Sequence, residues 1–174
     1  MEYPTAYERE LTLDDGRVVT VRPIVPEDAE LLQAEFDAAD PETLYRRFMT
    51  PSPKLPQSRF RFLATVDYTY RFAVVVFSPD GEGVAIARYE GHPTKFDAEV
   101  AVVVKPDWRQ VGLARRLFAM LDERATESGI THLNAVYLAE NDAAAALMAT
   151  SGFGAPHIEG GVVEVGKDIA VPAG

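Results

Sequence analysis

The feature that most constrains the fold is a buried strand that leads through a short loop into an amphipathic helix. Residues 98–104 (AEVAVVV) are rich in β-branched side chains, which favour a strand. From 112 to 128, apolar residues recur at helical spacing while acidic residues occupy the opposite face. A strand at 132–138 and an Ala-rich helix at 142–150 follow. This order predicts an α/β (α+β mixed) fold, with helices packed on the faces of a mixed sheet.

The segments on either side supply the rest of the sheet. Residues 9–22 alternate around Asp14-Asp15-Gly16 and predict an N-terminal β-hairpin. The other expected elements are a helix opening at Pro26 with a buried stripe of Leu31, Leu32 and Phe36, a helix at 41–49, a proline-enforced loop at 51–56, strands at 71–77 and 84–89, and a terminal hairpin at 153–169 that turns near Gly160-Gly161.

Composition narrows the possible partners. The 174 residues, 47% of them hydrophobic, predict one globular domain over 1–174. A net charge of −10 argues against nucleic acid, whose recognition needs a surplus of Lys and Arg. No apolar run approaches the roughly 20 residues that span a bilayer, so no membrane partner and a cytoplasmic location are expected. The chain has no Cys, and His132 and His157 are isolated, so no metal site is expected.

The loop between the central strand and helix is a candidate anion site. Backbone N–H groups at a helix N-terminus lack partners within the helix, and Gly112 leaves room for a ligand to approach them. Arg115 and Arg116 lie in the first turn, where two cations oppose the helix dipole unless an anion binds there. Alternatively, both arginines extend into water and the loop is a routine connection. The spacing fits neither a Walker loop nor a dinucleotide fingerprint.

Residues 109–114 (RQVGLA) resemble the acyl-CoA signature of the GNAT acyltransferase superfamily, in which Arg or Gln is followed by two residues, Gly, one residue, and Gly or Ala. The strand before it and the helix after it also fit, and residues 141–153 resemble the superfamily's second cofactor segment. The similarity extends over nearly the whole chain from about Val18. It implies the GNAT fold, a mixed, mostly antiparallel central sheet flanked by helices on both faces, with an acyl-CoA-binding core at 98–153.

Within that superfamily, the sequence is similar to the catalytic domain of bacterial Pat-type protein lysine acetyltransferases. The shared features are 13–16 (LDDG), 21–24 (VRPI), 26–28 (PED), 41–48 (PETLYRRF) and Ala98-Glu99. The resemblance implies direct transfer of an acetyl group from acetyl-CoA to a primary amine. A protein lysine is the preferred acceptor, and a small amine is the alternative. An alternative from another functional class is that the chain is a catalytically weak regulatory module that binds acyl-CoA. Such proteins often carry a regulatory domain, for which 174 residues leave no room, so regulation by a fused ligand-binding domain is not expected.

The resemblance also implies which residues hold the cofactor. The loop and the first turn of the helix would hold the pyrophosphate through their backbone N–H groups, and Arg109 and Arg115 would add positive charge. This segment comprises Arg109, Gln110, Val111, Gly112, Leu113, Ala114 and Arg115. Backbone groups of Val102, Val103 and Val104 would pair with the amides of the pantetheine arm. Asn141 would contact that arm or cap the helix that follows it, and both roles stay open.

Glu99 is the candidate catalytic residue. An alkylammonium with a pKa near 10.4 is only about 0.1% neutral at physiological pH, so attack by an amine needs a general base. A carboxylate in a half-buried strand, its pKa raised by desolvation, can accept the proton. From the residues alone, a solvated strand residue is the competing interpretation, and the position of Glu99 in the resemblance favours the base. Glu90, Asp97 and His92 are weaker candidates.

Other positions leave the acid and the acceptor open. Many GNAT enzymes have Tyr where this chain has Met148, and Met cannot protonate a departing thiolate. Tyr137 could substitute, although its strand position does not indicate this. Arg46 and Arg47 either line the substrate groove or pair with neighbouring acids, and general energetics favour pairing. The loops at 51–56 and 91–97 contain no recognition pattern, and the sequence predicts no particular oligomeric state.

Overall fold

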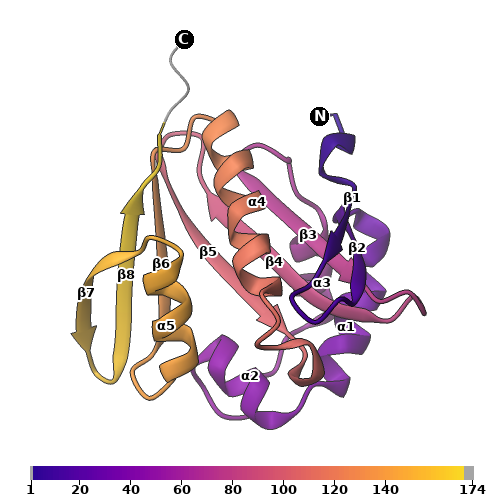
Figure 1. Cartoon of the computed structure of the whole chain (residues 1–174), viewed down its shortest axis with the longest axis horizontal. Coiled ribbons are helices and arrows are strands. Elements are labelled where there is room, and N and C mark those ends of the chain that lie inside the picture. Colours follow the sequence, from indigo (N-terminus) through magenta and orange to yellow (C-terminus); the bar gives the residue numbers. More distant parts are fainter. Residues whose placement is uncertain (1, 171–174) are drawn as a thin grey trace.

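The computed structural model describes residues 2–170, which form a twisted eight-stranded sheet with helices on both faces (Figure 1). The strand order is β1-β2-β3-β4-β5-β6-β8-β7. Only β5 and β6 pair in parallel, and every other neighbouring pair is antiparallel. The strands are β1 (Arg9–Thr12), β2 (Val18–Pro23), β3 (Arg71–Phe77), β4 (Gly83–Gly91), β5 (Asp97–Val104), β6 (His132–Leu138), β7 (Gly154–Glu159) and β8 (Val162–Asp168). The expected mixed, mostly antiparallel sheet is confirmed.

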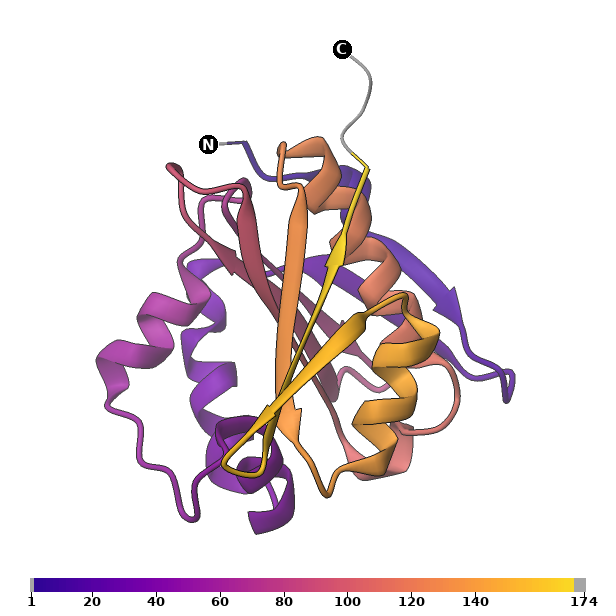
Figure 2. The ribbon, with the colours of Figure 1, turned by 90° about the vertical axis from the view of Figure 1, so that its left-hand side faces the viewer.

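The helices divide between the two faces of the sheet. Figure 2 shows α1, α2 and α3 on one side and α4 and α5 on the other. Their bounds are α1 (Ala29–Ala38), α2 (Pro41–Phe48), α3 (Gln57–Ala64), α4 (Leu113–Glu127) and α5 (Asp142–Thr150). Among residues 2–170, no helix is long and apolar enough to cross a bilayer.

The larger hydrophobic core lies between the sheet and α4. The apolar stripe predicted for this helix is confirmed, since Leu117, Phe118, Leu121 and Ala125 are buried against strand residues. A smaller cluster around Ile24, on the other face, packs under α1 and α3. Packing of this apolar stripe against the strands therefore determines the position of α4 on the sheet.

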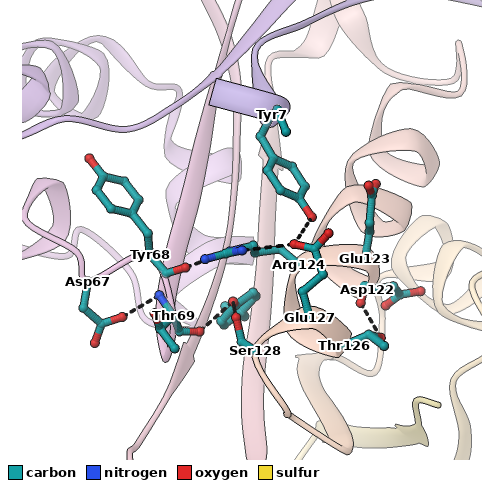
Figure 3. Close-up of polar contacts among 12 residues, drawn as sticks. Tyr7, Asp67, Tyr68, Thr69, Asp122, Glu123, Arg124, Thr126, Glu127 and Ser128 are labelled. Atoms are coloured by element: carbon teal, nitrogen blue, oxygen red, sulfur yellow. Dashed lines mark hydrogen bonds and ion pairs between the residues drawn. The ribbon is translucent and has the colours of Figure 1, made fainter. Parts of the chain in front are cut away.

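The C-terminal end of α4 is held by polar contacts to the segments that precede β1 and β3 (Figure 3). Arg124 donates to the backbone carbonyl of Tyr68 at 2.8 Å and pairs with Glu127 at 3.0 Å. Glu127 also accepts a hydrogen bond from Tyr7 at 3.0 Å. Gly129, with φ +77°, then ends the helix as expected. With this end held, the opposite end of α4 is placed firmly beside β5.

Two expectations differ from the structure. The helix α3 was not expected after the proline loop, because it has neither a side-chain cap nor a continuous apolar stripe. The proposed buried stripe of α1 is wrong, since Leu31, Leu32 and Phe36 are only half-buried. Both leucines border a cavity of about 340 Å³ between α1 and the sheet, so α1 packs against the strands only in part.

Candidate active site

The site begins where β5 and β6 separate. The strand β5 pairs with β4 from Ala98 to Val104, but it pairs with β6 only at residues 97–99. Beyond Glu99 the two strands diverge, which Figure 1 shows as a V that opens toward the N-terminus of α4. The result is a groove of about 210 Å³, lined by residues 99–104 of β5, by Thr43, Arg46 and Arg47 of α2, by Arg109, and by Tyr137, Asn141 and Met148 opposite.

The free edge of β5 offers backbone groups to a ligand. Within residues 2–170, no strand pairs with the β6-facing edge of 100–104. The carbonyl of Val104 is already occupied, because Arg109 Nε donates to it at 2.8 Å. Arg109 also donates to Thr43 Oγ1 at 2.9 Å, so its guanidinium joins the end of β5 to α2. This bracing role was not expected for Arg109, since Thr43 lies 66 residues away in the sequence.

The loop before α4 has the backbone that an anion cradle requires. Gln110 and Gly112 have φ of +61° and +78°, in the left-handed region. A Cβ at position 112 would lie 2.6 Å from Asp14 Oδ2, so a larger residue would strain the left-handed backbone and displace the side chains of Asp14 and Arg116. Leu113 is buried and anchors the first turn, Ala114 faces the groove, and Arg115 is exposed. A backbone of this kind at a helix N-terminus is suited to binding an anion.

Asp14 supplies a contact that sequence reasoning missed. Its carboxylate lies beside the cradle, 2.9 Å from Arg116 and 3.8 Å from Arg115. Its backbone N–H donates to the carbonyl of Val111 at 3.0 Å. The turn of the N-terminal hairpin therefore covers one side of the loop, and both arginines of the first turn have a carboxylate within the chain.

Glu99 lies in the groove at the point where β5 and β6 part. The half-buried environment expected for this residue is wrong, since its side chain is exposed. Glu90 lies directly opposite on β4, but Arg71 at 2.6 Å and Arg88 at 2.7 Å engage its carboxylate. Among residues 2–170, Glu99 makes no ion pair. Neither Asp97 nor His92, the other weaker candidates, borders the groove.

The two arginines of α2 have different surroundings. Arg46 pairs with Glu42 at 2.8 Å, as expected. Arg47 points into the same groove as Glu99 and makes no ion pair or side-chain hydrogen bond within the described part of the chain. Burial lowers the pKa of the Arg47 guanidinium, and the charge of Glu99 opposes this shift. For Arg47, the groove-lining alternative is therefore the correct one.

The wall opposite β5 contains the remaining candidates. Asn141 caps α5, because its Oδ1 accepts the N–H of Ala144 at 3.1 Å, and it also borders the groove. Met148 and Tyr137 border the groove as well. The groove therefore contains a side chain, the phenol of Tyr137, that can donate a proton from the wall where Met148 cannot. For residues 2–170, no group of three potential metal-binding side chains was found.

Comparison with known proteins identifies the family. The family described as "Acetyltransferase (GNAT) domain" matches residues 19–154. An acetyltransferase of Pseudomonas aeruginosa is 30% identical over 145 residues, which are 82% of this chain and 78% of that protein. Acetyltransferase Pat of Mycolicibacterium smegmatis is 33% identical over 139 residues, which are 76% of this chain but only 40% of that protein. The chain therefore belongs to the GNAT family, and it is an acetyltransferase.

Solved structures agree with this assignment. The GNAT domain of S. lividans PAT superposes with a TM-score of 0.87 at 28% identity, covering 97% of this chain and all of that one. A GNAT phosphinothricin acetyltransferase from Sinorhizobium meliloti, solved in complex with acetyl-CoA, superposes with a TM-score of 0.70 at 16% identity, covering 91% of this chain and 89% of that one. The second match shows the shared fold alone.

Proposed function

We propose that this acetyltransferase transfers the acetyl group of acetyl-CoA to the side-chain amine of a protein lysine. The observation that carries the proposal is the groove between β5 and β6, which runs from Arg109 and Ala114, beside the proposed phosphate cradle, to Glu99, whose carboxylate makes no ion pair among residues 2–170. The similarity to Pat proteins supports a lysine acceptor, and an acetyl-CoA complex in the same fold supports the donor.

The proposed cofactor site uses backbone more than side chains. The N–H groups from Val111 to Arg115 hold the pyrophosphate, and the free edge of Val102 and Val103 pairs with the pantetheine arm. Arg109 acts mainly by holding the end of β5 and α2 together. Acetyl-CoA supplies an acetyl thioester, whose thiol leaving group has a pKa of about 8.5.

Glu99 is the proposed general base. It accepts a proton from the acceptor amine, directly or through one water, so that the nitrogen can bond to the acetyl carbon as the carbon–sulfur bond breaks. Its exposed position lets a lysine reach it from outside the protein. The sulfur leaves as a thiolate, and the phenol of Tyr137 is the proposed proton source, because Met148 has no proton to give.

The first prediction concerns this base. Glu99→Gln should lower kcat by roughly 10²-fold or more while leaving the Kd for CoA unchanged, because the amide keeps the shape but cannot accept the proton. The measurement is thiol release from acetyl-CoA with a lysine peptide, together with calorimetric CoA binding. Asp97→Asn is the matched control, since Asp97 lies on the same strand but outside the groove and should retain wild-type turnover. Unchanged turnover in Glu99→Gln would remove Glu99 from the mechanism.

The catalytically weak binding module stays as a second candidate, because the groove has Met148 where many GNAT enzymes have a tyrosine. The same assay separates the two functions. CoA binding without thiol release across a panel of lysine proteins and small amines would favour the binding module.

A further inference from the structure

Arg47 is a cation inside the groove that nothing in the proposed reaction uses. It projects from α2 toward the end of the groove that holds Glu99, whereas the phosphate cradle follows the other end of β5. The five residue-to-residue steps from Glu99 to Val104 separate these two ends by roughly 17 Å at the rise of a strand. Arg47 is therefore placed to meet the acceptor and not the phosphates of the donor.

The charges around Arg47 leave a positive excess. Glu99 on β5, Glu90 on β4 and Arg59 on α3 all act on its guanidinium. Arg71 and Arg88, which also face this region, are occupied by Glu90. Four arginines thus surround two glutamates in a protein whose net charge is −10.

Such a cation needs an anion when an acceptor closes the groove. A guanidinium that is partly desolvated and lacks hydrogen-bond acceptors is costly, and a carboxylate satisfies it through two parallel N–H···O bonds. A lysine ammonium alone would add a further positive charge beside Arg47, so it cannot supply this contact.

We propose that Arg47 determines acceptor specificity by binding a carboxylate close to the reacting amine. This inference rests on the proposed function and narrows its substrate class. Two sources provide that chemistry: an acidic residue beside a lysine in a protein, and the α-carboxylate of a free amino acid.

The test compares acceptors that differ only in this charge. One pair is a lysine peptide with Glu or Gln next to the lysine, and the other is free lysine and lysinamide. Wild-type protein should prefer the carboxylate member of at least one pair by about 10-fold or more in kcat/KM. Preference within the peptide pair indicates a protein substrate, and preference within the lysine pair indicates a free amino acid.

Substitutions test whether Arg47 is the source of the preference for a carboxylate-bearing acceptor. Arg47→Gln should abolish it with little effect on the amide acceptor, and Arg47→Lys should retain part of it, because an ammonium keeps the charge but loses the planar fork. Arg61→Gln, an equal change of charge on the exposed side of α3, should leave it intact. Thermal melts and CoA titrations confirm that each variant folds and binds the donor.

The competing role for Arg47 is to act on Glu99. In that case Arg47→Gln would slow both members of each pair equally and shift the pH profile of kcat/KM, which would overturn the inference. Equal use of both members by the wild type would also overturn it, with the acetyltransferase function intact. Absence of thiol release with every acceptor would instead overturn the proposed function, and this inference with it.

Discussion

At the scale of single residues, the absence of a side chain at Gly112 has a large effect. Its backbone is left-handed, and a Cβ there would collide with the side chains of Asp14 and Arg116. The strain of φ +78° and the loss of space are two separate penalties. Gly129 has a nearly identical φ of +77°, but an added Cβ there would have nothing within 4 Å. A substitution at Gly129 therefore measures the backbone strain without the loss of space.

We expect Gly129→Ala to destabilise the fold by about 1 kcal/mol through the left-handed strain alone, and Gly112→Ala to cost somewhat more, because its Cβ also displaces the side chains of Asp14 and Arg116. Only Gly112→Ala should also weaken CoA binding, since only there does the methyl group displace the side chains beside the cradle. Urea unfolding measures the first effect and calorimetry the second. Equal CoA affinity in both variants would argue against a phosphate cradle at this loop.

Single residues also mark the limit of sequence reasoning. The glycine-containing turn into α4 was predictable because its glycine and the helix start lie within a few residues of one another, and its anion-binding role stays a prediction. The occupancy of Arg46 by Glu42 was predictable for the same reason, as an (i, i+4) pair. The contacts of Asp14 and Arg109 were not predictable, because each joins segments that are far apart in the sequence.

At the scale of elements, the N-terminal hairpin and the start of α4 act together. The turn between β1 and β2 places the carboxylate of Asp14 beside Arg115 and Arg116. An anionic donor arriving at the cradle would meet this negative charge, which reduces the attraction of both arginines. The hairpin would thus weaken anion binding at the proposed site.

Asp14→Asn should therefore tighten CoA binding, by about 2- to 5-fold for one partly exposed charge at this distance. Isothermal titration at low ionic strength measures the change, and added salt should reduce it. Asp15→Asn is the control, because it removes the same charge from the same turn while its carboxylate pairs with Arg17 and not with α4. If both variants bound CoA more tightly by the same factor, the smaller net negative charge of the protein would explain the effect. Weaker CoA binding by Asp14→Asn would show that Asp14 positions the two arginines.

Most elements were predictable from periodicity, and their arrangement was only partly so. The bounds of β3, β6 and α5 coincide with the expected ranges, because apolar pattern and capping residues are local signals. The splaying of β5 from β6 was not predictable from either strand, since it depends on where pairing between them stops. The resemblance to a known family implied only that the arm of the cofactor lies beside this strand, and the groove itself is a finding of the structure.

At the scale of the whole molecule, stability in acid depends on opposing effects. Protonation of carboxylates brings the net charge from −10 toward zero near the pI of 4.7, which lowers self-repulsion. The same protonation removes native ion pairs. Asp28, at the start of α1, forms a two-point ion pair with Arg22 of β2, with both distances 2.8 Å, and accepts the N–H of Val25.

Burial tends to raise the pKa of Asp28, but the hydrogen bonds from Arg22 and Val25 outweigh it and hold the pKa below its usual value. The pair therefore stabilises the fold fully above the unfolded pKa of about 3.9, and this contribution is lost as the pH falls through the lower folded pKa. Asp28→Asn should lower the free energy of unfolding by about 2 kcal/mol at pH 7. Loss of a fully buried ion pair would cost more, but Arg22 is one-third exposed.

The measurement is urea unfolding of both proteins from pH 7 to pH 2, and the difference between them should shrink below about pH 4. Glu123→Gln, which breaks a more exposed pair with Arg9, should cost much less at pH 7. A difference between wild type and Asp28→Asn that does not change with pH would show that packing, and not the ion pair, accounts for the loss.

Because β5 and β6 stop pairing after Glu99, the stability of the fold can depend on the concentration of a bound cofactor. Backbone groups on the open edge of β5 have no strand partner in residues 2–170. If a pantetheine arm pairs with them as proposed, acetyl-CoA completes the sheet from outside, and a ligand that binds only the folded chain stabilises it by mass action. The acetyl-CoA level of the cell would then act both on the turnover of the enzyme and on its resistance to proteolysis.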